Sequence, residues 1–264
     1  QLGNWPDIEQ PNYIENAYEF LNEPGEWYFD SITNWLFYYP LENEPHPNSE
    51  QIEFYIPSTE TLLDISGNST HSIKNLYFQG LIFKHTNWLR PNEYDQSFVD
   101  VQANFQLYEN TYTRSPGSIV VQFANNIVFE NCTFTKFGSA GIDFFDGTKN
   151  SSIIGCIFDD ISGTAVNIGG IDGSYSEGDS RITGNNTVAN NYFTNIAVEY
   201  KGGHGVWAGY VQEVNIIHNR FLGTAYTAIS CGWGWSGVQT FCWNNTISYN
   251  HIINFNNQNN YKYK

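Results

Sequence analysis

The sequence contains no methionine, only four cysteines, and only 11 lysine and arginine residues against 27 aspartate and glutamate residues. The net charge of −16 creates a field that repels nucleic acid and anionic membranes, so we expect neither as a partner. No apolar run is long enough to cross a bilayer, which argues against membrane insertion. The shortage of basic residues also disfavours polyuronate substrates, whose carboxylates need lysine, arginine or calcium.

Motifs of several enzyme classes are missing too. The sequence has no phosphate-binding loop, no nucleophile elbow, no basic patch and no zinc-type spacing of Cys and His. His85, His204 and His218 can bind a metal only if the fold brings them together, and single histidines more often make hydrogen bonds in turns. We therefore expect no metal and no cofactor.

What the chain does contain is an internal repeat. Five short segments superimpose at intervals of 23, 24, 40 and 23 residues, with these equivalent positions: Ile119, Ile142, Val166, Val206 and Ile229. Each repeat carries a second strand and a turn that ends in an apolar residue, and residues 61–83 resemble an earlier copy. Short strands of period two without helical periodicity indicate an all-β fold, a parallel β-helix of about six coils over residues 61–264. The sequence ends one strand into a coil, so we expect further sequence beyond Lys264.

A polar ladder is expected inside this β-helix. Asn191, Asn219 and Asn250 each fall two residues before the apolar end of their coil. Stacked amides hydrogen-bond one another and so satisfy polar groups that are buried between coils.

Residues 1–60 have a different pattern. Three aromatic segments, residues 23–30, 35–40 and 51–57, are separated by proline and asparagine turns and predict a small antiparallel sheet. Because a β-helix exposes open strand edges at its ends, we expect this sheet to cap or flank the first coil.

The cysteines suggest an oxidising compartment. Cys132 and Cys156 lie one coil apart, where stacked Cα atoms are about 5 Å from each other and within range of a disulfide. Two buried thiols are the equal alternative. Cys231 and Cys242 are the other candidate pair.

Secretion is also consistent with five glycosylation sequons, although chance alone gives about as many. The acceptors are Asn68, Asn131, Asn150, Asn185 and Asn244, and the best placed are Asn150 and Asn244, in turns between strands.

Several motifs occur in a fixed order over nearly the whole chain. They are residues 23–30, 35–40, 80–88, 198–203, 209–212, 218–219 and 232–235. This order resembles the β-helix proteins grouped around family 141 of the glycoside hydrolases. The resemblance implies a right-handed helix and action on plant or microbial polysaccharide, with fucosidase and xylanase activities among the group's enzymes.

Strand alternation indicates where a site could form. If the aligned apolar residues point inward, Asp143, Asn167, Trp207 and Ser230 point outward in one column, the floor of a groove. Insertions at residues 84–117, 171–186 and 199–204 surround this column and mark the binding face.

Glycoside hydrolysis needs two carboxylates, and we choose Asp143 on the floor and Glu199 in a neighbouring loop. An outward Asp and an exposed loop Glu without a catalytic role are an equal alternative for this pair. Weaker candidates lie in glycine-rich segments where aspartate often caps a turn: Asp146, Asp172 and Asp179. Substrate contacts are expected from the column and from the aromatic residues at its end: Asn167, His204, Trp207, Tyr210 and Trp233.

Two function classes therefore compete. The first is an extracellular glycoside hydrolase with a polysaccharide as its partner. The second is a carbohydrate-binding or structural β-helix that assembles end to end as an oligomer or filament. A polysaccharide lyase or epimerase is disfavoured by the few basic residues. The first two differ in whether two carboxylates approach within about 5 to 10 Å on the groove floor.

Overall fold

The computed structural model describes residues 16–89, 98–99, 105–108, 111–171, 178–232 and 241–253. The chain divides into two compact units that separate between residues 56 and 57. None of the helices in these ranges has the length and apolar character needed to cross a bilayer.

The first unit contains an antiparallel pair of strands, β1 (Trp27–Asp30) and β2 (Trp35–Tyr38), preceded by the 3-10 helix η1 (Tyr18–Phe20). The Asp30 carboxylate closes the turn between them by accepting a hydrogen bond from the Ile32 backbone N–H at 2.9 Å. The prediction of a third strand at residues 51–57 is wrong. That segment has no strand partner, and its contact with the sheet is the Phe54 ring, 5.7 Å from the ring of Tyr38.

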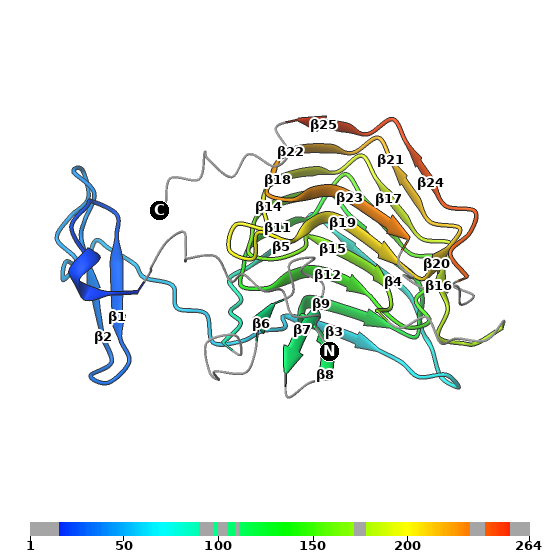
Figure 1. The fold of residues 1–264 in the computed structure, drawn as a ribbon, viewed down its shortest axis with the longest axis horizontal. Coiled ribbons are helices and arrows are strands. Elements are labelled where there is room, and N and C mark those ends of the chain that lie inside the picture. Colours follow the sequence, from blue (N-terminus) through cyan, green and yellow to red (C-terminus); the bar gives the residue numbers. More distant parts are fainter. Residues whose placement is uncertain are drawn as a thin grey trace, which may run out of the picture. The chain divides into compact units, whose positions relative to one another are not determined.

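The second unit consists of three parallel sheets, each with one strand from every coil (Figure 1). Sheet I contains β3 (Leu63–Ser66), β9 (Gly117–Gln122), β12 (Ala140–Phe144), β15 (Val166–Gly169), β19 (His204–Gly209) and β23 (Thr227–Gly232). Sheet II contains β4 (Ile73–Gln79), β10 (Ala124–Glu130), β13 (Ser152–Ile154), β17 (Thr187–Ala189), β21 (Asn215–Ile217) and β24 (Thr246–Ser248). Sheet III contains β5 (Ile82–Lys84), β11 (Thr133–Phe137), β14 (Ile157–Ile161), β18 (Tyr192–Ile196), β22 (Arg220–Thr224) and β25 (His251–Ile253).

This topology confirms the parallel β-helix. The five residues aligned from the sequence pair with one another across sheet I, from Ile119 to Ile229. One detail of the prediction is wrong. The segment that was expected to form a turn in each coil instead forms a third strand, which belongs to sheet III. Strands of three to five residues are too short for their alternation to distinguish them from a turn.

The core is a continuous column of inward-facing side chains. In sheet III, five phenylalanine rings stack on one another at centroid distances of 4.5 to 5.3 Å: Phe83, Phe134, Phe158, Phe193 and Phe221. The last four are fully buried. Such stacks arise because each coil places the same position directly above its equivalent in the coil below.

The predicted amide ladder is confirmed. Asn191 Nδ2 donates to Asn219 Oδ1 at 3.0 Å, and Asn219 Nδ2 donates to Asn250 Oδ1 at 3.0 Å. The column continues below Asn191 with Cys156, whose backbone N–H donates to Asn191 Oδ1 at 2.8 Å, and then with Cys132. Cysteine and asparagine thus occupy equivalent positions in successive coils.

Left-handed residues form the corners of the coils. In the first residues of the sheet II strands or just before them, five asparagines and one glutamate have φ between 52° and 60°: Asn75, Asn126, Asn150, Asn185, Glu213 and Asn244. Asparagine tolerates this conformation better than other non-glycine residues, which explains why the corners are rich in Asn.

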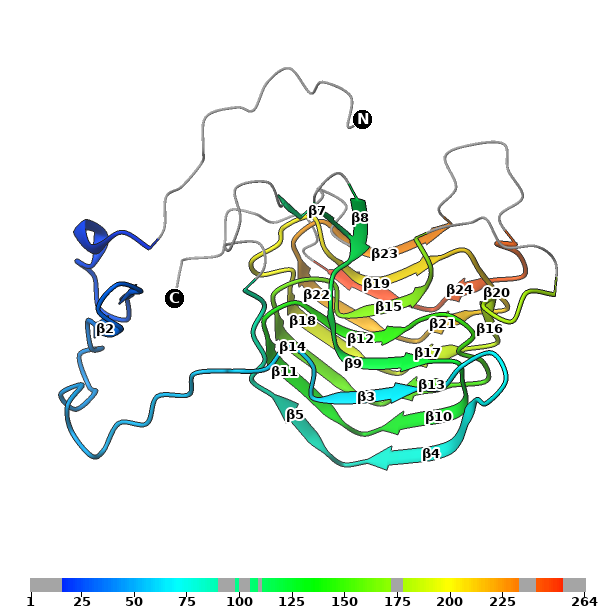
Figure 2. The same cartoon turned by 90° about the horizontal axis from the view of Figure 1, so that it is seen from below.

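Two further pairings lie outside the three main sheets. The insertion before β9 contains an antiparallel sheet of β6 (Phe98–Val99), β7 (Phe105–Tyr108) and β8 (Thr111–Arg114). Figure 2 shows β8 running across, rather than along, the direction of the sheet I strands. A second insertion contributes β16 (Thr183–Gly184), which pairs with β20 (Val211–Gln212).

Candidate functional site

The outward side chains of sheet I form one column. Asp143, Asn167, Trp207 and Ser230 are in register on β12, β15, β19 and β23, as the alternation predicted. Their exposure differs from the prediction, because Asp143 is 4% exposed and Asn167 and Trp207 are each 1% exposed. The column is therefore covered, and the expectation that it forms an open groove floor is wrong.

Arg114, the last residue of β8, covers the column. Its Nε donates to Asp143 Oδ2 at 3.0 Å, its second terminal nitrogen bonds Asp143 Oδ1, and the first donates to the Gly169 carbonyl at 2.7 Å. The guanidinium carbon lies 4.3 Å from the Phe145 ring centroid and 5.9 Å from that of Trp207. Arg114 was not predicted as a site residue. The one sequence feature that pointed to it is its basic side chain, because basic residues are few in this chain and Arg114 lies in the insertion directly before a repeat strand.

The Arg114–Asp143 pair is a buried, bidentate ion pair. Burial raises the pKa of the Asp143 carboxyl above its ordinary value, while the charge and hydrogen bonds of Arg114 oppose that rise. Replacing either partner alone leaves an uncompensated charge in a poorly solvated place, which is strongly destabilising. The pair can thus position an ionisable carboxyl on sheet I, and it also fastens β8 onto that sheet.

Glu199, the second predicted carboxylate, follows β18 in the turn that leads to β19. Its side chain is exposed, and its backbone N–H donates to the Ser162 carbonyl at 3.3 Å. The next residue, Tyr200, packs edge-on against Trp88 at 5.0 Å, and Lys201 donates to the Val198 carbonyl. The turn is therefore held by contacts on both sides of Glu199.

Two buried polar atoms near the column have no hydrogen-bond partner among the described residues. They are Oδ1 of Asn167 and Nδ1 of His204. Burial lowers the pKa of His204 to about 4, so the imidazole is neutral at pH 7. Its ring meets Tyr226 edge-on at 5.7 Å. Unpaired buried polar atoms are uncommon and are consistent with a site that binds a polar group.

The remaining predicted site residues have other surroundings. Tyr210 is 9% exposed, at a left-handed corner. Asp146 lies half-buried in the turn after β12. Asp179 pairs with Arg181 at 2.7 Å, and these hydrogen bonds lower the pKa of Asp179 to about 2. Trp233 and Asp172 lie outside the described residues.

The predicted disulfides are not present in this structure. All four cysteines are free, with Cys132 and Cys156 buried, Cys231 exposed and Cys242 half-buried. The predicted stacking of Cys132 and Cys156 is nevertheless correct, since Ile157 N–H donates to the Cys132 carbonyl at 2.9 Å across adjacent coils. Each of these thiols donates to backbone carbonyls.

The five predicted glycosylation acceptors are all exposed: Asn68, Asn131, Asn150, Asn185 and Asn244. Their side chains are not all free, because Asn185 Nδ2 donates to Asn150 Oδ1 at 2.5 Å. Whether they carry glycans stays a prediction. Within the described ranges, no three His, Cys, Asp or Glu side chains gather closely enough to hold a metal ion.

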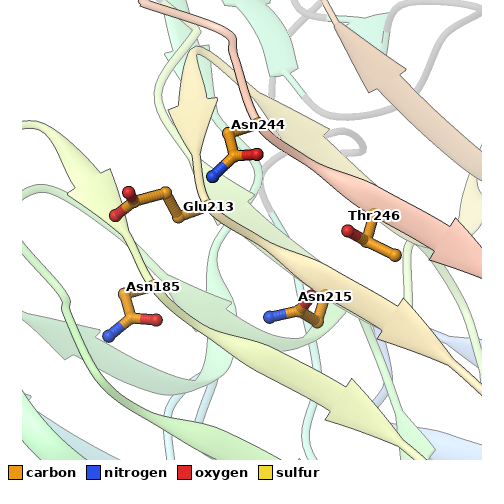
Figure 3. Close-up of a pocket in the computed structure, with 5 residues that line it drawn as sticks. All are labelled: Asn185, Glu213, Asn215, Asn244 and Thr246. Carbon is orange, nitrogen blue, oxygen red and sulfur yellow. The ribbon is translucent and has the colours of Figure 1, made fainter.

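A polar hollow of about 380 Å³ lies on the outer side of sheet II (Figure 3). It is lined by the corner residues Asn185, Glu213 and Asn244 and by Asn215 and Thr246 of β21 and β24. The lining contains one carboxylate, whereas glycoside hydrolysis commonly needs two. This hollow is therefore a weaker candidate for catalysis than the column of sheet I.

Comparisons with known proteins agree with this geometry. A family model described as "Right handed beta helix region" matches residues 59–186. A solved structure titled "Glycoside hydrolase" superimposes with a TM-score of 0.75 and 28% sequence identity, over 86% of this chain and 42% of that one. The chain is a right-handed β-helix similar to a glycoside hydrolase. It spans about two fifths of the length of that enzyme, and a search of curated proteins finds no match.

The right-handed β-helix that the sequence resemblance implied is thus confirmed, and its similarity to one glycoside hydrolase is shown. Among the described residues, the best-defined candidate for a functional group is the Arg114–Asp143 ion pair, which joins β8 of the insertion to β12 of sheet I.

Proposed function

We propose that this chain is part of an extracellular glycoside hydrolase of the family 141 type, acting on a neutral plant or microbial polysaccharide. The observation that carries this proposal is the similarity to a glycoside hydrolase over most of the chain, at 28% identity. The net charge of −16 supports a neutral rather than an anionic glycan, because the protein's field repels polyuronates.

Asp143 and Glu199 are the proposed carboxylate pair. One carboxyl protonates the glycosidic oxygen while the other acts as base or nucleophile. Support for Asp143 comes from its fixed carboxyl and its place in the Asn167 and Trp207 column. Substrate must displace the Arg114 side chain to reach the Asp143 carboxyl.

A direct test compares wild type with Asp143→Asn and Glu199→Gln on neutral polysaccharides, measured as released reducing ends. Each substitution keeps the side-chain shape and is expected to lower kcat by about 10²- to 10⁴-fold. Asp64→Asn is the matched control, because Asp64 occupies the same outward column but is exposed on β3. Circular dichroism identifies variants that fail to fold. Full activity in a folded Asp143→Asn variant would refute the assignment.

The burial of Asp143 favours a second candidate, a carbohydrate-binding or structural β-helix. In that case Arg114–Asp143 fastens β8 and performs no chemistry. Wild-type protein that binds glycans but releases no reducing ends supports this candidate. Light scattering over a range of concentrations tests whether the molecules also assemble end to end.

Secretion is the proposed localisation. The exposure of all five acceptors is compatible with it, as a glycosyltransferase could reach each of them, but their number is no larger than chance gives. Expression through a eukaryotic secretory pathway, followed by enzymatic removal of N-glycans, should produce a mass shift. Protein retained in the cell without glycan would contradict the proposal.

A further inference from the structure

The four cysteines form two pairs with opposite surroundings. Cys132 and Cys156 are each 1% exposed in the ladder column. Cys231, near the end of β23, is exposed, and Cys242, before β24, is half-buried. Only the second pair can be reached by a soluble oxidant without opening the core.

Cys231 and Cys242 meet although residues 232–241 separate them in the sequence. Cys242 Sγ lies 3.7 Å from the carbonyl oxygen of Gly232, the residue after Cys231, which places the two side chains close together. The backbone beside Cys242 is held in place, because Trp243 forms a parallel bridge with Gln212. Both sulfur atoms are therefore anchored on the β-helix.

Asn245 points a hydrogen-bond donor at the sulfur of Cys242. Its Nδ2 lies 3.6 Å from Cys242 Sγ and also donates to the Val211 carbonyl, while its Oδ1 accepts the Val214 N–H at 2.9 Å. The amide is thus fixed in orientation. Donors around the sulfur, with the Cys231 thiol foremost, hold the pKa of Cys242 below its ordinary value. The thiolate is the form that reacts with disulfides.

The buried pair has the opposite environment. Cys156 Sγ lies 3.5 Å from the carbonyl oxygens of Phe129 and Ile154, and Cys132 Sγ lies 3.5 Å from those of Phe78 and Glu130. Burial raises the pKa of the Cys156 thiol to about 12, which keeps it protonated at pH 7. Both thiols are also buried away from any soluble oxidant.

We propose that Cys231 and Cys242 form a disulfide that links the end of β23 to the corner before β24, while Cys132 and Cys156 remain thiols. This inference does not depend on the proposed hydrolase activity. It reverses the order of preference drawn from coil spacing alone, which favoured Cys132 with Cys156.

The reaction is a thiol–disulfide exchange with a small-molecule disulfide such as oxidised glutathione. The Cys242 thiolate attacks one sulfur, the glutathione S–S bond breaks, and one glutathione thiolate leaves. Cys231 then loses its proton to solvent, and its sulfur displaces the second glutathione from Cys242. Two protein thiols are oxidised, and one glutathione disulfide is reduced to two thiols.

The first test counts thiols in the whole chain after equilibration with oxidised glutathione. Maleimide labelling under denaturing conditions, followed by peptide mapping, should find label on Cys132 and Cys156 and a cross-link joining Cys231 to Cys242. Label on all four cysteines, or a link between Cys132 and Cys156, would overturn the proposal.

Single substitutions test which cysteines form the cross-link. Cys242→Ser should abolish the cross-link and leave Cys231 labelled or bound to glutathione, whereas Cys156→Ser, the buried control, should retain the cross-link. If a variant fails to fold, native-state alkylation of wild type still decides the matter. Cys242 should react with iodoacetamide at least about 10-fold faster than Cys132 at pH 7. Equal rates would contradict the assignment of Cys242 as the nucleophile.

Discussion

Equivalent positions in the inner coils and in the last coil carry the same kinds of residue. These side chains are buried in the inner coils and exposed in the last coil. Ile216 on β21 is 1% exposed, and its register partner Ile247 on β24 is 49% exposed. Phe221 on β22 is fully buried, and its partner Ile252 on β25 is 43% exposed. Position within a coil decides which way a side chain points. Burial depends on the coils stacked on both sides, as in other repeat proteins.

The largest expected difference between the two regions concerns the phenylalanine stack. Phe193→Ala removes a ring packed at 4.8 Å from Phe158 and 4.5 Å from Phe221, so unfolding free energy should fall by about 3 to 5 kcal/mol. Ile252→Ala, the counterpart at the edge, should cost less than about 1 kcal/mol. Urea denaturation measures both. Similar losses would mean that the last coil is covered in solution.

The second expected difference between the inner coils and the edge is in how stability depends on pH. The pKa of His204 is lowered from 6.5 to about 4 by burial, so the unfolded chain binds more protons than the folded chain between these values. Stability should therefore fall by about 3 kcal/mol as pH drops from 6.5 to 4. His204→Gln should remove this part of the pH dependence, measured by urea denaturation across the range. His251→Gln, at an exposed position on β25, is the control for a His-to-Gln substitution outside the core.

The smallest of these differences lies within the amide ladder. Asn219→Ala deletes a buried amide that bonds Asn191, Asn250 and the Val188 carbonyl, and should cost about 1 to 3 kcal/mol. Asn250→Ala removes the half-buried last member and should cost less, since water can replace it. Thermal denaturation compares the two variants. A larger loss at Asn250 would contradict the role assigned to coil stacking.

The repeat made most of the fold predictable. Period and alternation identified the register of Ile142 with Val166 and the stacking of Asn191 on Asn219, because both follow from equivalent positions one coil apart. The third strand of each coil escaped detection because its few residues carry too little alternation. Residues 51–57 have the composition of a strand but no partner, and composition alone cannot supply one.

The candidate site was less predictable than the fold. Alternation correctly placed Asp143 and Trp207 on the outer side of sheet I. It could not show that Arg114 covers them, because Arg114 belongs to an insertion with no counterpart in other coils.

The column that starts with Cys132 and ends with Asn250 changes chemistry once along its length. Thiols occupy two neighbouring coils, amides occupy the next three, and one hydrogen bond from Cys156 N–H to Asn191 joins the two blocks. At the junction Asn191 still finds backbone partners in the thiol coil, because its Nδ2 donates to the Ile153 carbonyl and its Oδ1 accepts the Cys156 N–H. Thiol and amide can therefore be neighbours in the column without leaving a buried polar group unpaired, so the composition of the column can change one coil at a time.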